Sequence, residues 1–184
     1  SIRDIRRPIG RPIPKQPRAA AKSSGNGLKR ALATHVEAFG YKVDRLADGS
    51  FTPILYKGVG TNASDRAYQL GVTSGGALQF YLQNTNTNQF TATTADGLIG
   101  ADDWHHVAAV IDKPAGQLRL YVDGSLQAVL GIFFDNRAFG VSLLIGRSRE
   151  AGVGNFEGTI DELRIWNVAR TQAQIQASMG AELV

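Results

Sequence analysis

Three carboxylates near the end of the chain are the residues best placed to support acid-base chemistry. Glu157, Asp161 and Glu162 lie in one predicted strand, FEGTIDELRIW. Hydrolysis of a glycosidic bond needs two carboxylates on one surface, about 5 to 5.5 Å apart for a retaining reaction. Glu157 and Asp161 fall on the same side of a strand, but Thr159 stands between them and Glu162 points the other way. We therefore predict no catalytic residue and a protein that is not an enzyme.

The adjacent histidines His105 and His106 invite a metal-binding or proton-transfer interpretation. Neighbouring residues of a strand point to opposite faces, so these two side chains cannot serve one site. Trp104 and Trp166 are predicted to lie in the hydrophobic core, with a role as sugar-stacking platforms as the alternative. Asp161, Glu162 and Arg164, in contrast, are expected to form hydrogen bonds that tie strand ends together.

The elements that position these residues are short segments with strand-like alternation, bounded by Gly, Asp or Asn. They cover residues 34–43, 51–58, 66–73, 77–84, 90–95, 104–112, 118–127, 143–146 and 156–166. A short C-terminal helix is expected to begin after Thr171, because Thr171 and Gln174 form a capping-box pattern and Ile175 and Met179 are four residues apart.

Several strands carry local signals that refine their placement. WHHVAAVID (104–112) is apolar on both faces, which predicts a central strand covered on both sides. Asp123 and Gly124 suit a type I′ hairpin turn, Gly40 permits a bulge, and Pro53 belongs at a sheet edge or near a strand start. In FEGTIDELRIW the apolar alternation breaks, which predicts either a bulge near Asp161 or burial on both faces.

The segments WHHVAAVID, LRLYVDG, IGRS and FEGTIDELRIWNVARTQAQI together resemble the laminin G-like branch of the concanavalin A-like lectin/glucanase superfamily. The resemblance is close over residues 103–176 and weaker over residues 34–83. It implies an all-β jelly roll of two antiparallel sheets packed face to face, in which the Trp-His pair is a structural feature. Catalytic members commonly carry Glu-x-Asp-x-Glu, which this chain lacks, and other members bind carbohydrates, proteins or surfaces.

The chain divides into a basic, Pro-rich arm (residues 1–27) and a laminin G-like domain (28–184). Residues 1–30 hold six Arg and three Lys against one Asp, a net charge of +8, so the rest carries −4 of the total +4. We expect the arm to dock on neighbouring subunits in a homo-oligomer or larger assembly, although packing on its own domain is an alternative. The residues assigned to this docking are Ile2, Arg3, Ile5, Arg6, Arg7, Ile9, Arg11, Ile13 and Arg18.

Other ligands receive less support from the sequence. Nucleic-acid binding is not expected, because no aromatic residue for base stacking precedes Phe39. We expect no cofactor; calcium is a weaker expectation, because relatives often use it and loop oxygens could bind it. Its candidate ligands are Asn62, Asp65, Asp135 and Asn136. The polar NTNTNQ stretch (84–89) could present amides to a sugar, but it also suits a solvated hairpin end.

The cellular setting is predicted from what the sequence lacks. No apolar run is long enough to span a membrane, no secretory signal is visible at the start, and there is no cysteine. We expect a virion-associated decoration, head or tail protein whose arm docks on neighbours and whose jelly roll faces outward, with glycan binding as a further role. The alternative is a secreted or cell-surface carbohydrate-binding domain, and a glycoside hydrolase ranks last.

Overall fold

The structure is a computed structural model that describes residues 51–61, 65–84, 88–133 and 141–180, together with the backbone of residues 35–43. The arm, residues 1–27, and its docking residues lie outside the described part of the chain. Strands dominate this part, and the order of strands along the chain follows the predicted segments. The strands are β1 (His35–Val43), β2 (Phe51–Gly58), β3 (Arg66–Thr73), β4 (Leu78–Gln83), β5 (Gln89–Thr93), β6 (Trp104–Asp112), β7 (Gln117–Val122), β8 (Ser125–Gly131), β9 (Leu144–Ile145) and β10 (Gly158–Asp161), and the helix is α2 (Gln172–Ser178).

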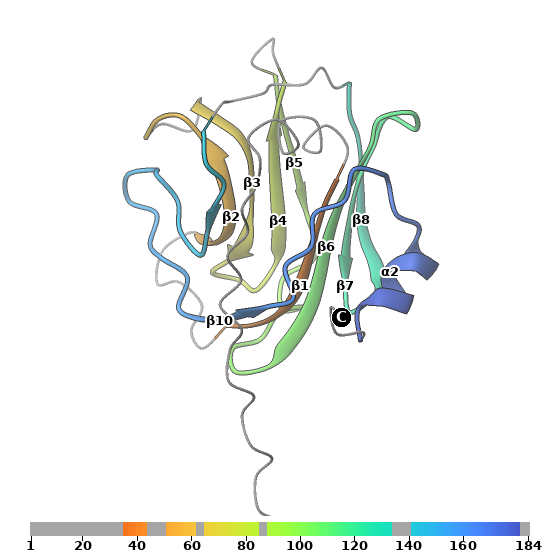
Figure 1. Cartoon of the computed structure of the whole chain (residues 1–184). Coiled ribbons are helices and arrows are strands. Elements are labelled where there is room, and N and C mark those ends of the chain that lie inside the picture. Colours follow the sequence, from red (N-terminus) through yellow and green to blue (C-terminus); the bar gives the residue numbers. More distant parts are fainter. Residues whose placement is uncertain (1–34, 44–50, 62–64, 85–87, 134–140, 181–184) are drawn as a thin grey trace, which may run out of the picture.

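Two antiparallel sheets form the domain, as predicted (Figure 1). Sheet A has the order β10-β1-β6-β7-β8, and sheet B has the order β5-β4-β3-β2-β9. Consecutive strands are usually neighbours, but β1 lies between β6 and β10, so the first and last described strands pair with each other. The segment after β8 crosses to sheet B as β9 and returns to sheet A as β10, which links the two layers.

The core lies between the two sheets. In β4, Leu78, Phe80 and Leu82 point into this core, whereas Gln79 and Tyr81 point to the opposite face, as the alternation predicts. Apolar side chains of β2, β3, β5, β6 and β7 also belong to this layer. Its largest fully buried members lie on both sheets, so the core fixes how the sheets pack.

Strand β6 is covered on both faces, which confirms the prediction for this segment. Val107 and Ala109 belong to the core between the sheets, whereas Ala108 and Val110 pack with Ile175 of α2 on the outer face of sheet A. The helix begins at the predicted cap: the Thr171 hydroxyl accepts from the Gln174 amide, and the Gln174 side chain accepts from the Thr171 amide.

The turns and irregularities agree with the sequence signals. Asp123 and Gly124 have φ values of 50° and 71°, as a type I′ turn requires. The β1 register shifts between Glu37 and Gly40, and Pro53 is the third residue of β2. The break in FEGTIDELRIW occurs at Glu162, directly after β10, where φ is 53°. This left-handed residue ends the regular alternation.

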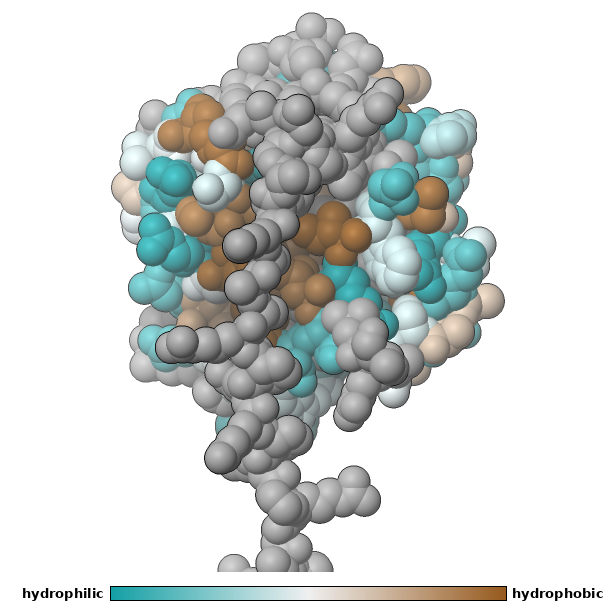
Figure 2. All heavy atoms as spheres, viewed as in Figure 1, coloured by the Kyte–Doolittle hydropathy of each residue, from teal (hydrophilic) through white to brown (hydrophobic). Residues whose placement is uncertain are grey.

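The surface combines polar and apolar residues. On the face shown in Figure 2, hydrophobic residues lie among hydrophilic ones. Large apolar side chains that are exposed include those of Trp104, Leu126, Val129 and Phe133. Within the described residues, none of the helices has the length and apolar character needed to cross a bilayer.

Candidate functional site

The outer face of sheet B, which points away from the core, carries a group of polar and aromatic residues that has no counterpart in the core. Tyr56 pairs with Gln69, and Gln69 pairs with Tyr81, so these three side chains form a row across β2, β3 and β4. Arg66 opens β3, next to a register shift that lets its side chain turn toward this row. With Glu150 from the segment after β9, they form what we call the Arg66 cluster.

Arg66 is the centre of this cluster. Its Nε lies 2.7 Å from Glu150 Oε1, and its Nη1 donates to Gln69 Oε1 at 2.9 Å. The guanidinium carbon also lies 3.8 Å from the centre of the Tyr81 ring, a cation–π arrangement. The Arg66 and Glu150 side chains are only 16% and 11% exposed, so the ion pair is largely shielded from water.

The Gln69 side chain is the unusual member of the cluster. The residue is 1% exposed, and its Nε2 has no hydrogen-bond partner among the described residues. Buried amide donors are nearly always satisfied, because an unmade hydrogen bond costs about 1 to 3 kcal/mol. The Gln69 donor is therefore an unsatisfied buried group beside a cation and two tyrosines.

Burial controls the protonation of the cluster. It raises the pKa of Glu150, and Arg66 opposes this by favouring the carboxylate. The pKa of Tyr56 is also raised, first by burial and then by Glu150, while Arg66 and Arg149 act in the opposite direction. Tyr56 therefore stays neutral, and its hydroxyl donates to the Gly60 carbonyl at 3.1 Å.

The segment that supplies Glu150 is fastened to β2 and to the turn after it. Lys57 Nζ donates to the Val141 carbonyl at 2.9 Å, and the Gly146 amide donates to the Ile54 carbonyl at 2.9 Å. The Ala151 amide donates to the Thr61 carbonyl at 3.3 Å. These bonds hold the Arg149–Glu150 segment next to β3.

The two adjacent histidines are placed apart, as predicted. His105 Nδ1 lies 3.0 Å from Asp123 Oδ2, while the other carboxylate oxygen accepts from the His106 amide at 2.9 Å. His106 lies on the outer face of sheet A with Ala108, and burial lowers its pKa. The pair therefore anchors the β7–β8 turn to β6 and forms no shared site.

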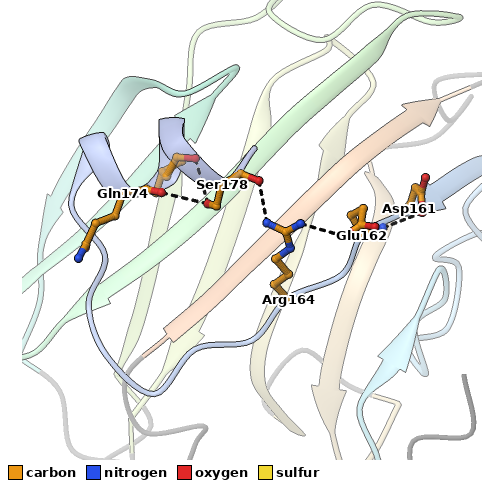
Figure 3. A network of polar contacts seen from close by, with 6 residues as sticks. Asp161, Glu162, Arg164, Gln174 and Ser178 are labelled. Carbon is orange, nitrogen blue, oxygen red and sulfur yellow. Dashed lines mark hydrogen bonds and ion pairs between the residues drawn. The ribbon is translucent and has the colours of Figure 1, made fainter. Parts of the chain in front are cut away.

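Asp161, Glu162 and Arg164 form a hydrogen-bonded network with α2 (Figure 3). Arg164 Nη2 contacts Glu162 Oε2 at 2.9 Å and Nη1 donates to the Ser178 carbonyl at 2.7 Å. The Asp161 carboxylate accepts from the Glu162 amide at 2.9 Å. These residues form hydrogen bonds, as expected, but the bonds of Arg164 fasten α2 to the segment after β10 instead of joining two strand ends.

The prediction that Trp104 lies in the core is wrong. Its side chain is 54% exposed at the start of β6. Alternation places it on the outer face with Ala108 and Val110, but α2 covers only those two residues. Trp166 is half-buried, with the Arg170 guanidinium carbon 3.9 Å from its ring centre.

Of the four predicted calcium ligands, the structure describes only Asp65. Asn62, Asp135 and Asn136 lie outside the described residues, and the Asp65 carbonyl accepts from the Val59 amide at 3.1 Å. Within the described part of the chain, His, Asp and Glu side chains form no group of three suited to a metal ion. The calcium expectation therefore stays a prediction.

The Arg66 cluster was missed by sequence reasoning, although part of its signal was present. The alternation in ALQFYLQN placed Tyr81 on the face away from the core, and RAYQLGVT likewise separated Gln69 from its apolar neighbours. The contact between Arg66 and Glu150 depends on how the segment after β9 folds back, and no local pattern encodes it.

Solved structures with the same fold include three useful comparisons. The Ruminococcus gnavus IT-sialidase CBM40 has a TM-score of 0.71 and 22% identity, over 86% of this chain and 89% of that one, and its structure bound to alpha2,3 sialyllactose gives the same values. Leech intramolecular trans-sialidase gives 0.68 and 20%, over 88% of this chain and 26% of that one. The heptameric SAP-like pentraxin of Limulus polyphemus gives 0.52 and 19%, over 78% and 70%.

These similarities establish the fold, and the family rests on the sequence. A comparison with the curated proteins finds no match. The family model described as the concanavalin A-like lectin/glucanases superfamily matches residues 42–176, which is most of the chain. The chain therefore belongs to the concanavalin A-like lectin/glucanases superfamily, as its strand motifs had indicated.

Proposed function

We propose that this chain is a non-enzymatic glycan-binding module and that its ligand contacts the Arg66 cluster. The observation that carries the proposal is the buried Gln69 amide donor, which has no partner among the described residues and lies beside Arg66. Its neighbours Tyr56 and Tyr81 are 0% and 5% exposed, so they hold the polar groups in place and do not stack on a sugar. Arg66 supplies a cation for recognition of an anionic group.

An acidic sugar is the ligand that this chemistry fits best. Arg66 and the exposed Arg149 both lie close to Tyr56, so a sugar carboxylate would meet two cations and one competing anion, Glu150. A similar structure is bound to sialyllactose, which supports the same class of ligand here. A sugar carboxylate would meet the exposed Arg149 first, and Glu150 would have to move away from Arg66 before the sugar could reach Arg66 and the buried Gln69 amide.

The test compares a sialylated and a neutral ligand by titration calorimetry. The wild type should bind 3′-sialyllactose more tightly than lactose. Arg149→Gln should weaken binding of the sialylated sugar about tenfold, because it removes a charge-assisted contact from an exposed side chain without opening the core. Arg170→Gln removes the same charge beside Trp166 and serves as the control. Equal affinity for the two sugars, or an equal loss in both variants, would contradict the proposal.

A role in a particle is a second candidate, and the charge distribution favours it. The first 30 residues carry +8 and the remainder −4, a segregation that suits an arm bound to other subunits. We propose that the arm anchors the module, through its isoleucines and arginines, in a virion-associated assembly or on an extracellular surface. The sandwich would then face outward with its glycan site, and the two functions are compatible.

A further inference from the structure

The β6–β7 turn and the end of β8 lie at the same end of the strands (Figure 1), and residues of both segments line a groove. Its volume is about 530 Å³, within the range of roughly 300 to 1,000 Å³ that is usual for small-molecule sites. The lining residues are Lys113, Pro114, Ala115, Gly116, Gly131, Ile132 and Phe133. None of these residues contributes to the Arg66 cluster.

Phe133 forms an aromatic wall of the groove and is 89% exposed. Its backbone is held on both sides: the buried Ile132 donates its amide to the Gly116 carbonyl at 2.8 Å, and Asn84 Nδ2 donates to the Phe133 carbonyl at 3.4 Å. A phenyl ring exposed to this extent on a fastened backbone has its apolar faces available to a ligand.

Two glycines leave the floor of the groove without side chains. Gly116 has a φ of 61°, and a Cβ there would lie 3.3 Å from the Ile132 carbonyl oxygen, so the turn favours glycine. Gly131 is different, because a Cβ built on it meets no atom within 4 Å and its φ is not in the left-handed region. The space beside Gly131 is therefore open, and the backbone conformation there does not require a glycine.

We propose that this groove, which we call the Phe133 groove, is a second saccharide site that takes a neutral hexopyranose unit stacked on the Phe133 ring. The flat C–H face of a pyranose matches an exposed aromatic ring, and the glycine floor lets its hydroxyls reach backbone groups. Of the seven lining residues only Lys113 is ionisable, which distinguishes the groove from the cationic Arg66 cluster. The ligand class rests on the proposed glycan binding, whereas the location rests on the groove alone.

The test is a titration of the full chain, followed by ¹H–¹⁵N correlation spectra, with lactose, with maltotriose and with 3′-sialyllactose. One of the two neutral sugars should shift the amide signals of residues 113, 115–116 and 131–133 in a saturable manner. Phe133→Ala should weaken this binding at least about tenfold, because it removes the aromatic anchor. Gly131→Leu should fill the groove and also abolish the shifts, without the backbone strain of a left-handed position.

Val129→Ala is the matched control, because it removes an exposed apolar side chain from β8 outside the groove. Thermal melting of each variant verifies that the fold is retained. Shifts in the groove that are lost in Phe133→Ala and Gly131→Leu but kept in Val129→Ala support the proposal, even if sialyllactose leaves the Arg66 cluster unchanged. Sugar-induced shifts confined to the Arg66 cluster, or no saturable shift with either neutral sugar, overturn it.

Discussion

At the scale of single residues, the ion pair between Arg66 and Glu150 has two opposing effects on the proposed glycan site. It keeps Arg66 oriented, but it also occupies the cation with an internal anion. Burial raises the pKa of Glu150, so its carboxylate becomes neutral at a higher pH than an ordinary glutamate does. A sialylated ligand keeps its own charge over this range and gains access to Arg66 as Glu150 is protonated.

This competition predicts a pH dependence of binding. As the pH falls from about 7.5 to about 5, affinity for 3′-sialyllactose should rise, because protonation of Glu150 begins at a higher pH than for an ordinary glutamate and releases Arg66. Glu150→Gln should show the higher affinity at both values, with little change between them, because its side chain carries no charge. Calorimetric titration at the two pH values measures this. Glu157→Gln, at an exposed carboxylate, should behave like the wild type, and a Glu150→Gln protein with the original pH dependence would contradict the argument.

At the scale of elements, α2 covers part of the outer face of sheet A through a single fully buried side chain, that of Ile175. Its neighbours Ala108 and Val110 are small or branched residues of β6, and Tyr121 lies beside them. The Arg164 contact to the Ser178 carbonyl and the Gln176 contact to the Gly124 carbonyl fasten the end of the helix. The apolar face of the helix therefore depends on one anchor.

Removal of this anchor should destabilise the whole domain. Ile175→Ala leaves a cavity under α2 and is expected to lower the free energy of unfolding by about 2 to 5 kcal/mol. The exposed Val168 provides a control, since Val168→Ala should change it by less than about 0.5 kcal/mol. Urea denaturation followed by tryptophan fluorescence measures both. A loss at Ile175 no larger than that at Val168 would show that polar contacts alone hold the helix.

The predictable part of this molecule is the part encoded by local pattern. Alternation in β4 and β6, the Asp123–Gly124 turn and the Thr171 cap each follow from a few neighbouring residues. Trp104 was misplaced because alternation gives the face of a side chain but not the length of strand that a helix covers. The Arg66 cluster joins segments distant in sequence, so its geometry required the fold.

At the scale of the whole molecule, the described strands and the basic arm occupy different parts of the sequence. The first described strand, β1, begins at His35, and all strands and α2 follow it. The described strands alone account for the order of both sheets, in which β1 lies between β6 and β10. The strong positive charge, in contrast, is concentrated before residue 31. Stability is therefore expected to reside in the sandwich and assembly in the arm.

Deletion of residues 1–27 tests this division. The truncated chain should keep its melting temperature, because no described strand is removed, but it should be monomeric where the full chain forms larger species. Light scattering during gel filtration measures both masses.

Replacement of Ile2, Ile5, Ile9 and Ile13 by Ser should reproduce the truncation if the isoleucines fill pockets on a neighbour, since each buried isoleucine contributes about 1.5 to 3 kcal/mol. A chain with all four replacements that still assembles, but that dissociates in high salt, would instead assign the contact to the arginines. A truncated chain that assembles as the full chain does would show that the arm has no part in assembly.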